Sequence, residues 1–272
     1  GSVEVRIPDL PEFIQELHQN EVYAIARMEV FQDPVYAFAR PKEAVHQKSG
    51  AIWQDNKGLA WVDPASMEAW DYNVQVALEA EKIGFDEIQV DYVRFPSDGN
   101  LSDMVFPIWD QNIPKREIIS GFLAYFYDQV KPTGVFVSAD IFGLTLWEEK
   151  HDLNIGQRLE DAIVLLDYVS PMVYPSHYPK DFNGFLNPAR YPYEIIFQNL
   201  EKAKQRVPKE YSKLRPWLQD FALGAEYDAS MVRKQIQAVY DAGLEEWMLW
   251  NASNIYTADA LQDQVLKVTE SQ

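Results

Sequence analysis

One stretch, Asp86-Glu-Ile-Gln-Val-Asp91-Tyr-Val-Arg94-Phe-Pro96, constrains the fold more than any other. With the two-residue period of a β-strand, apolar side chains fall on one face, and Glu87, Gln89 and Asp91 fall on the other. A parallel strand that is covered on both faces should be almost wholly apolar. The polar face therefore predicts a barrel strand that looks into a polar interior and ends, at Asp91, on the rim of a site. The alternative is that Asp91 is held in an ion pair with Arg94 or another base.

Composition sets limits on the class of protein. The chain has 272 residues, of which 47% are hydrophobic, and it can form one domain over residues 1–272. A net charge of −18 argues against nucleic acid or an anionic membrane surface as a partner. No apolar run approaches the ~18 residues of a transmembrane segment. The absence of cysteine excludes disulfides and thiolate chemistry.

No cofactor or metal is expected. His18, His46 and His151 lack partners at the spacing of metal ligands. The sequence also has no glycine-rich phosphate loop, no nucleotide-binding fingerprint and no Ser-His-Asp order.

Helix and strand signals alternate along the chain, which predicts βαβ units and a parallel sheet. The fold class predicted is α/β, as a TIM-type (β/α) barrel. Helices are predicted over residues 10–20 (with Asp9 as N-cap), 64–83, 114–130, 155–166, 193–207 and 230–242 and from Thr257, and a loop or short hairpin over residues 53–61. Strands are predicted over residues 22–31, around Asp91, and over 135–142, 168–174, 214–221 and 246–251.

Polar and aromatic residues gather where these strands end. Asp140 is a second carboxylate in phase near the end of the strand over residues 135–142. Cleavage of a glycosidic bond needs two carboxyl groups, aromatic rings can pack on a sugar face, and amides can bind its hydroxyls. The pattern therefore predicts a carbohydrate site with Asp91 and Asp140 as catalytic residues. The substrate-binding candidates are Arg27, Glu29, Arg94, Tyr174, His177, Trp217, Gln219, Asp220, Trp250 and Asn251.

Several of these candidates have alternative interpretations. Arg27 and Glu29 share an inward phase and either serve the site or form buried ion pairs with neighbouring strand residues. Gln219 and Asp220 point to opposite faces, so at most one of them reaches the site directly. Trp250 is either core or a sugar platform. The aromatic interpretation predicts that rings such as those of Tyr174, Trp217 and Trp250 expose a face to solvent.

A family resemblance rests on five motifs that occur in order. The motifs are Val90-Asp91-Tyr-Val-Arg-Phe-Pro96-Ser-Asp-Gly99, Ser138-Ala-Asp140-Ile-Phe-Gly143, Ser170-Pro-Met-Val-Tyr174-Pro-Ser-His177-Tyr178, Arg215-Pro-Trp217-Leu-Gln219-Asp220-Phe221 and Leu249-Trp250-Asn251-Ala-Ser. From Ile7 to about Tyr256, the chain resembles a bacterial family of glycoside hydrolases that was formerly a domain of unknown function. The resemblance implies a TIM-type barrel related to α-amylase-like and α-galactosidase-like enzymes, and an extracytoplasmic or cell-envelope location.

The resemblance also implies roles for the two carboxylates. In such barrels the nucleophilic Asp ends the fourth strand, which matches Asp91. The acid/base ends the fifth strand in the amylase group, which matches Asp140, or the sixth strand in the α-galactosidase group, where this chain has Tyr174 and His177 instead. The expected activity is a retaining glycosidase acting on an α-linked poly- or oligosaccharide, in which burial and the neighbouring anion raise the pKa of Asp140. A carbohydrate-binding barrel without turnover is the second hypothesis.

One departure from the family concerns the start of the barrel. Family members carry two more βα units before the Ile7-Pro-Asp-Leu10 helix, and these units are not readable in this chain. The barrel is therefore expected to be incomplete at its N-terminus, with six strong strands. Either the chain is a fragment, or the barrel is open, or another chain closes the gap, for example through self-association.

Overall fold

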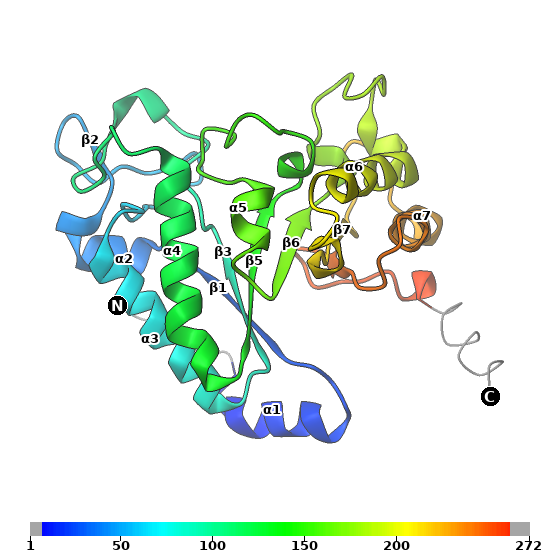
Figure 1. Ribbon diagram of the computed structural model, residues 1–272, viewed down its shortest axis with the longest axis horizontal. Coiled ribbons are helices and arrows are strands. Elements are labelled where there is room, and N and C mark those ends of the chain that lie inside the picture. Colours follow the sequence, from blue (N-terminus) through cyan, green and yellow to red (C-terminus); the bar gives the residue numbers. More distant parts are fainter. Residues whose placement is uncertain (1–6, 262–272) are drawn as a thin grey trace. The chain divides into compact units, whose positions relative to one another are not determined.

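The computed structural model describes residues 7–261, and Figure 1 shows the arrangement of its elements. The described residues divide into two compact units, one of residues 7–140 and 150–168, the other of residues 141–149 and 169–261. Parallel strands are joined by helices in both units. The predicted fold class is confirmed: the fold is α/β, with six parallel strands of an incomplete TIM-type barrel.

Three parallel strands form the sheet of the first unit, in the order β1 (Ile25–Glu29), β3 (Glu87–Asp91) and β5 (Phe136–Phe142), whose last two residues belong to the second unit. Arg27 lies opposite Gln89 on β3, and Gln89 lies opposite Ser138 on β5. Partners in a parallel register point to the same face, so polar side chains from three strands share one face of this sheet. Ile88 and Val90, on the other face of β3, are completely buried.

Helices cover the apolar face of the first unit. α3 (Met67–Ile83) and α4 (Lys115–Val130) lie side by side (Figure 1), and Phe122 of α4 makes edge-to-face contacts with Phe31 and with Trp70 of α3. The other helices of this unit are α1 (Leu10–Gln19), α2 (Pro34–Ala39) and α5 (Leu159–Ile163). Two short strands, β2 (His46–Gln47) and β4 (Met104–Val105), pair in antiparallel fashion outside the main sheet.

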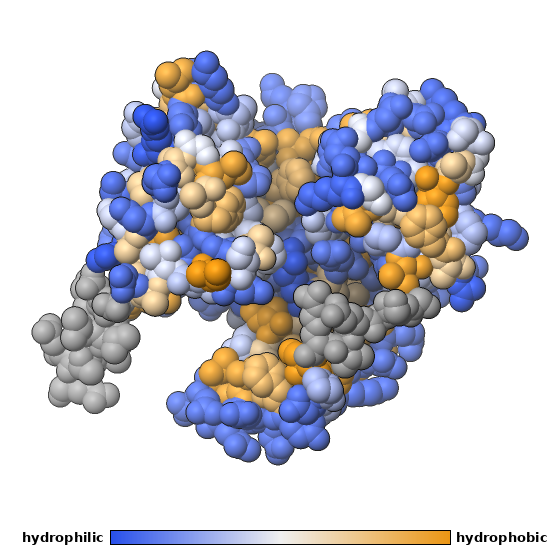
Figure 2. Space-filling view, turned by 180° about the vertical axis from the view of Figure 1, so that it is seen from behind, coloured by the Kyte–Doolittle hydropathy of each residue, from blue (hydrophilic) through white to orange (hydrophobic). Residues whose placement is uncertain are grey.

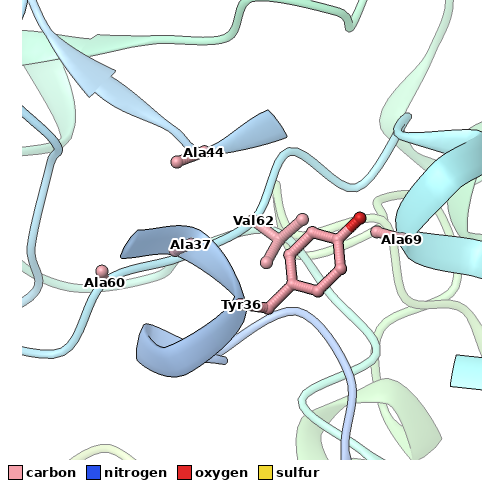
Figure 3. Close-up of a cluster of buried hydrophobic side chains, with 6 residues drawn as sticks. All are labelled: Tyr36, Ala37, Ala44, Ala60, Val62 and Ala69. Carbon is pink, nitrogen blue, oxygen red and sulfur yellow. The ribbon is translucent and has the colours of Figure 1, made fainter. Parts of the chain in front are cut away.

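The predicted hairpin over residues 53–61 is present, with Gln54 bridged to Ala60. Its C-terminal end packs onto the flanking helices through a small apolar cluster (Figure 3). The cluster consists of Tyr36, Ala37, Ala44, Ala60, Val62 and Ala69. Because most of its members are alanines, the chain segments approach one another closely there.

The second unit also has three parallel strands, β6 (Tyr168–Met172, whose first residue belongs to the first unit), β7 (Trp217–Gln219) and β8 (Met248–Trp250). Met172 pairs with Trp217, which in turn pairs with Met248. α6 (Pro192–Arg206) and α7 (Ala229–Asp241) pack against each other. Short 3-10 helices over the chain are Pro41–Glu43, Leu101–Asp103, Lys131–Thr133, Gly143–Leu146, Pro175–His177, Pro188–Arg190, Tyr211–Lys213 and Ala258–Ala260.

Some predicted elements differ from the observed ones for local reasons. The helix predicted from Pro64 begins at Met67, because the Ser66 side chain caps it by accepting a hydrogen bond from the Ala69 N–H. The helix predicted from residue 155 begins only at Leu159, because the Ile155 carbonyl instead accepts a hydrogen bond from the Phe95 N–H.

The two predicted helix ends nearest the chain termini differ from the structure or fall partly outside the described residues. Asp9 is at the N-cap position of α1 but makes no side-chain capping hydrogen bond. The predicted terminal helix starts as the 3-10 turn Ala258–Ala260, and its remainder lies outside the described residues. Within residues 7–261, no helix combines the length and the apolar character needed to cross a bilayer. Hydrophilic residues cover large areas of the face seen in Figure 2, in keeping with the high net charge.

Candidate active site

The inner face of β3 is polar and buried. Glu87, Gln89 and Asp91 are 0%, 1% and 5% exposed. At the start of the strand, the Glu87 carboxylate accepts hydrogen bonds from the Tyr23 hydroxyl at 3.1 Å and from the Ser138 hydroxyl. Buried carboxylates are stable only where such donors replace water. The polar interior predicted from the alternation of this strand is therefore present.

Asp91 and Asp140 meet at the guanidinium group of Arg27. Nε of Arg27 donates to Oδ2 of Asp140 at 3.0 Å, and Nη2 of the same group donates to Oδ2 of Asp91. Asp91 is the last residue of β3, and Asp140 is only 1% exposed near the end of β5. The structure thus brings the two predicted catalytic carboxylates to neighbouring nitrogens of one side chain. Arg27 forms ion pairs with residues of neighbouring strands, which is one of the two alternatives predicted for it.

The charges around Asp91 act in opposite directions. Burial is the largest influence and raises the pKa of Asp91, while the Arg27 guanidinium, the Tyr92 backbone N–H at 2.6 Å and Arg94 oppose this rise. Partial burial, followed by the negative charge of Asp91, raises the pKa of Glu29. The site therefore holds several carboxyl groups whose protonation is sensitive to each neighbouring charge.

Arg94 packs against two aromatic rings that also contact each other edge to face. Its guanidinium carbon lies 4.8 Å from the Trp61 ring centroid and 5.2 Å from that of Tyr92. Tyr92 has φ of 52°, so the chain turns sharply directly after Asp91. β3 ends at Asp91, as predicted, so Tyr92 lies just beyond the strand. Sequence reasoning did not assign Trp61 and Tyr92 to the site, although Trp61 was recognised in the hairpin.

Asp55 holds the hairpin that carries Trp61. Its Oδ1 accepts the Lys57 and Leu59 N–H groups at 2.8 and 3.0 Å, and its Oδ2 accepts the Trp61 indole at 3.0 Å and the Gln32 amide at 2.7 Å. Burial alone would raise the pKa of Asp55, but these hydrogen bonds together lower it. The carboxylate thereby fixes the position of the ring that stacks on Arg94.

In the second unit, Tyr174 and His177 lie with Phe221 in a group of aromatic rings. The Tyr174 centroid is 5.3 Å from that of His177 and 5.6 Å from that of Phe221. Burial lowers the pKa of His177. Gln219 is hydrogen-bonded next to this group: its Oε1 accepts the Ser176 N–H at 3.1 Å, and its Nε2 donates to the Phe221 carbonyl at 2.8 Å. These contacts give Gln219 a role in holding the loop after β6.

The predicted sugar platforms differ in their exposure. Tyr174 is only 6% exposed, so little of its ring is available to a ligand. Trp217 and Trp250 are partly exposed and contact each other edge to face, with centroids 5.8 Å apart. Either tryptophan of this pair can therefore offer part of a ring to solvent.

Asp220 points away from Gln219, as the strand alternation predicted. Its Oδ2 accepts the Thr257 N–H at 2.7 Å, and its Oδ1 accepts the Thr257 hydroxyl at 2.6 Å. The Asn251 side-chain amide donates to the Asp220 carbonyl. Asp220 and Asn251 thus hold the segment that follows β8.

The predicted site residues form two sets, one in each unit. Arg27, Glu29, Asp91, Arg94 and Asp140 belong to the first unit, and Tyr174, His177, Trp217, Gln219, Asp220, Trp250 and Asn251 belong to the second. Among the described residues, no group of three or more His, Asp or Glu side chains is arranged to hold a metal ion. The chemistry that the first set can perform is proton transfer and nucleophilic attack by carboxyl groups.

Parallel βα units with paired carboxylates at the ends of neighbouring strands define the class of barrel-type glycosidases. A family described as "Putative glycosyl hydrolase domain" matches residues 1–256, and the chain belongs to this family. The resemblance based on the five motifs is thereby confirmed, as is the expectation of a glycosidase. No match is found among curated proteins.

Several solved structures share the fold. The PgaB (BpsB) glycoside hydrolase domain from Bordetella bronchiseptica is 15% identical, with a TM-score of 0.63, over 92% of this chain and 77% of that chain. The spore cortex-lytic enzyme SleL from Bacillus cereus is 12% identical, with a TM-score of 0.58, over 94% and 62%. The α-galactosidase TtGalA from Thermus thermophilus is 10% identical, with a TM-score of 0.58, over 96% and 50%. At these identities the similarity shows a common fold.

Proposed function

We propose that the chain hydrolyses an α-linked poly- or oligosaccharide by a retaining mechanism, with Asp91 as nucleophile and Asp140 as general acid/base. The observation that carries the proposal is the junction of both carboxylates at Arg27, on neighbouring strands of a glycosyl hydrolase family fold. Two carboxyl groups that act on one glycosidic bond must lie within roughly 5–10 Å of each other. Contact with adjacent nitrogens of one guanidinium group is compatible with that requirement.

In the proposed reaction, Asp140 gives its proton to the glycosidic oxygen while Asp91 attacks the anomeric carbon. The bond to the leaving group breaks, and a glycosyl ester forms on Asp91. Asp140, now a carboxylate, then removes a proton from water, and the resulting attack on the anomeric carbon releases Asp91. The anomeric configuration is inverted twice and therefore retained.

We propose a polysaccharide of the bacterial cell envelope as the substrate class, and an extracytoplasmic or envelope-associated location. One similar structure is that of a spore cortex-lytic enzyme, and another is that of an α-galactosidase. Trp217 and Trp250, which are partly exposed, are the proposed sugar-contacting rings in the second unit. His177 is proposed to bind substrate at the loop that follows β6, with the largely buried Tyr174 packed against its ring.

A carbohydrate-binding barrel without turnover is the second candidate. It is favoured by the deep burial of both carboxylates and by the Arg27 side chain that already satisfies an oxygen of each. A resting ion-pair network of this kind can be purely structural. The two candidates differ in whether Asp91 is required for product release or only for folding.

The test compares wild type with Asp91→Asn and Asp140→Ala on aryl α-glycosides and on envelope polysaccharides, by release of reducing ends. Asp91→Asn should abolish turnover while the variant still folds and binds oligosaccharide, because the amide is not a nucleophile. Asp140→Ala should lose roughly 10²–10⁴-fold of its rate and regain part of it with azide or with a good leaving group. Asp128→Asn, on the exposed face of α4, is the matched control and should retain the wild-type rate.

Two results would count against catalysis by this pair. Retention of more than about a tenth of wild-type activity by Asp91→Asn would remove it as the nucleophile. Equal oligosaccharide affinity for wild type and both variants, with no product from any of them, would establish the binding barrel instead.

A further inference from the structure

Arg27 contacts both members of the proposed catalytic pair. It lies in the middle of β1, opposite Gln89, and its guanidinium group reaches Asp91 and Asp140 through two different nitrogens. Its side chain is 28% exposed, whereas those of the two aspartates are 7% and 1% exposed. Arg27 is thus partly exposed to solvent, whereas both carboxylates that it binds are buried.

A guanidinium group in this position has two effects. Charge-assisted hydrogen bonds from one rigid planar group fix the separation and orientation of the oxygens they bind. The positive charge also favours the ionised form of Asp91 against burial. The charged and titratable groups around it are Glu29 on β1, Asp91 at the end of β3, Tyr92 and Arg94 after that strand, and Asp140 on β5.

We propose that Arg27 is the positioning residue of the proposed catalytic pair, joining the two carboxylates through one guanidinium group and holding Asp91 as an anion ready for attack. The inference rests on the proposed function for its catalytic meaning. Its physical content, the control of Asp91 ionisation by Arg27, is independent of turnover. Arg27 is therefore assigned a role that is already present before substrate binds.

Two substitutions separate charge from bridging. Arg27→Met keeps an unbranched but shorter side chain and removes every donor. Arg27→Lys keeps the positive charge, but a compact ammonium group cannot reproduce the planar two-nitrogen contact. Arg116→Met is the matched control, because Arg116 pairs with Asp161 at 3.9 Å with its side chain 44% exposed.

The first readout is the titration of the Asp91 carboxyl group by ¹³C NMR on aspartate-labelled protein, with Asp91→Asn used to assign the signal. In Arg27→Met the midpoint should rise by at least about one pH unit, because an opposite charge at this distance typically lowers a carboxyl pKa by 1–3 units. Arg27→Lys should show a smaller rise, and Arg116→Met should show none. The labelled proteins need not be active for this measurement.

The second readout is the pH dependence of kcat/KM. An ionised nucleophile is required, so activity rises as pH increases through the Asp91 pKa, and Arg27→Met should move this acid limb to higher pH. Arg27→Lys should keep the limb closer to that of wild type but have a lower kcat, because the two carboxylates are no longer joined.

The outcomes distinguish the two proposals. An unchanged Asp91 midpoint in folded Arg27→Met would overturn the role of Arg27, whatever the activity. If Arg27→Met fails to fold, an Arg27→Lys midpoint and pH profile identical to those of wild type, with unchanged kcat, would overturn it. A raised midpoint in a protein whose wild type hydrolyses none of the sugars would support the control by Arg27 and reject the proposed hydrolase activity.

Discussion

Asp55→Asn should weaken the hairpin over residues 53–61 more than any exposed Asp→Asn change. The Asp55 carboxylate is 7% exposed and accepts four hydrogen bonds, two on each oxygen. An asparagine oxygen can serve only one of these two pairs of donors. The amide NH₂ then faces the other pair, and at least two donors are left without an acceptor.

The magnitude follows from those two lost contacts. A hydrogen bond to a charged group contributes about 1.5–3 kcal/mol. Loss of two should destabilise the closed hairpin by about 3–6 kcal/mol, and the lower figure corresponds to roughly a hundredfold increase in its opening equilibrium. Asp98→Asn is the matched control, because exposed Asp98 accepts a single hydrogen bond, from the Asn56 N–H at 3.0 Å, and should change the equilibrium by less than about 1 kcal/mol.

Hydrogen exchange of the Lys57 and Leu59 amides measures this opening directly, since both N–H groups donate to Asp55. Both amides should exchange much faster in Asp55→Asn, and almost unchanged in Asp98→Asn. The lowered pKa of Asp55 predicts that protection in wild type persists above the unfolded pKa of about 4 and is lost as pH falls through the folded value. Equal exchange in Asp55→Asn and wild type at pH 7 would refute the assignment of Asp55 as the hairpin's anchor.

Gly143→Ala should destabilise the second unit by about 1–3 kcal/mol in thermal unfolding, because a Cβ there would lie 2.5 Å from the Met172 carbonyl and 2.7 Å from the Tyr178 hydroxyl. Gly121→Ala is the control: the nearest atom to its Cβ would be 3.4 Å away, and alanine favours the helix, so the change should be neutral or stabilising. A larger loss of stability from Gly121→Ala than from Gly143→Ala would contradict the steric argument. The pKa of His177, measured by ¹H NMR, should lie below the usual value of about 6.5, because burial disfavours the imidazolium. A pKa above that value would contradict burial as the dominant influence on this ring.

The main elements could be predicted because their patterns are strong. The alternation from Glu87 to Asp91 gave both the strand and its polar face, and the long periodic helices α3 and α4 differ from prediction by at most three residues at either end. α2 was missed although Asp33 caps it by accepting the Tyr36 N–H, because six residues are too few to show a helical period. The end of β3 at Asp91 agrees with the prediction, but the left-handed backbone of Tyr92 that follows could not be predicted, because propensity does not reveal it.

Residue types indicated the candidate site, but their partners depended on tertiary structure. Asp91 and Asp140 were identified because each follows a strand in phase with other polar residues. The contact of Arg27 with both could not be read from the sequence, because its register places it opposite Gln89 and the side chain leans toward the strand ends. In the same way, nothing in the order of residues shows that Asp220 binds Thr257, which lies beyond the next strand.

The pairing of Asp220 with Thr257 has a practical consequence for choosing where to shorten the chain. Both Asp220 oxygens receive their hydrogen bonds from Thr257, and the carboxylate is only 2% exposed. The family match ends at residue 256, one position before this donor. A fragment that ends at residue 256 would keep the buried Asp220 carboxylate but lose both of the Thr257 donors that hydrogen-bond to it. A fragment that is to fold should therefore extend at least through Thr257.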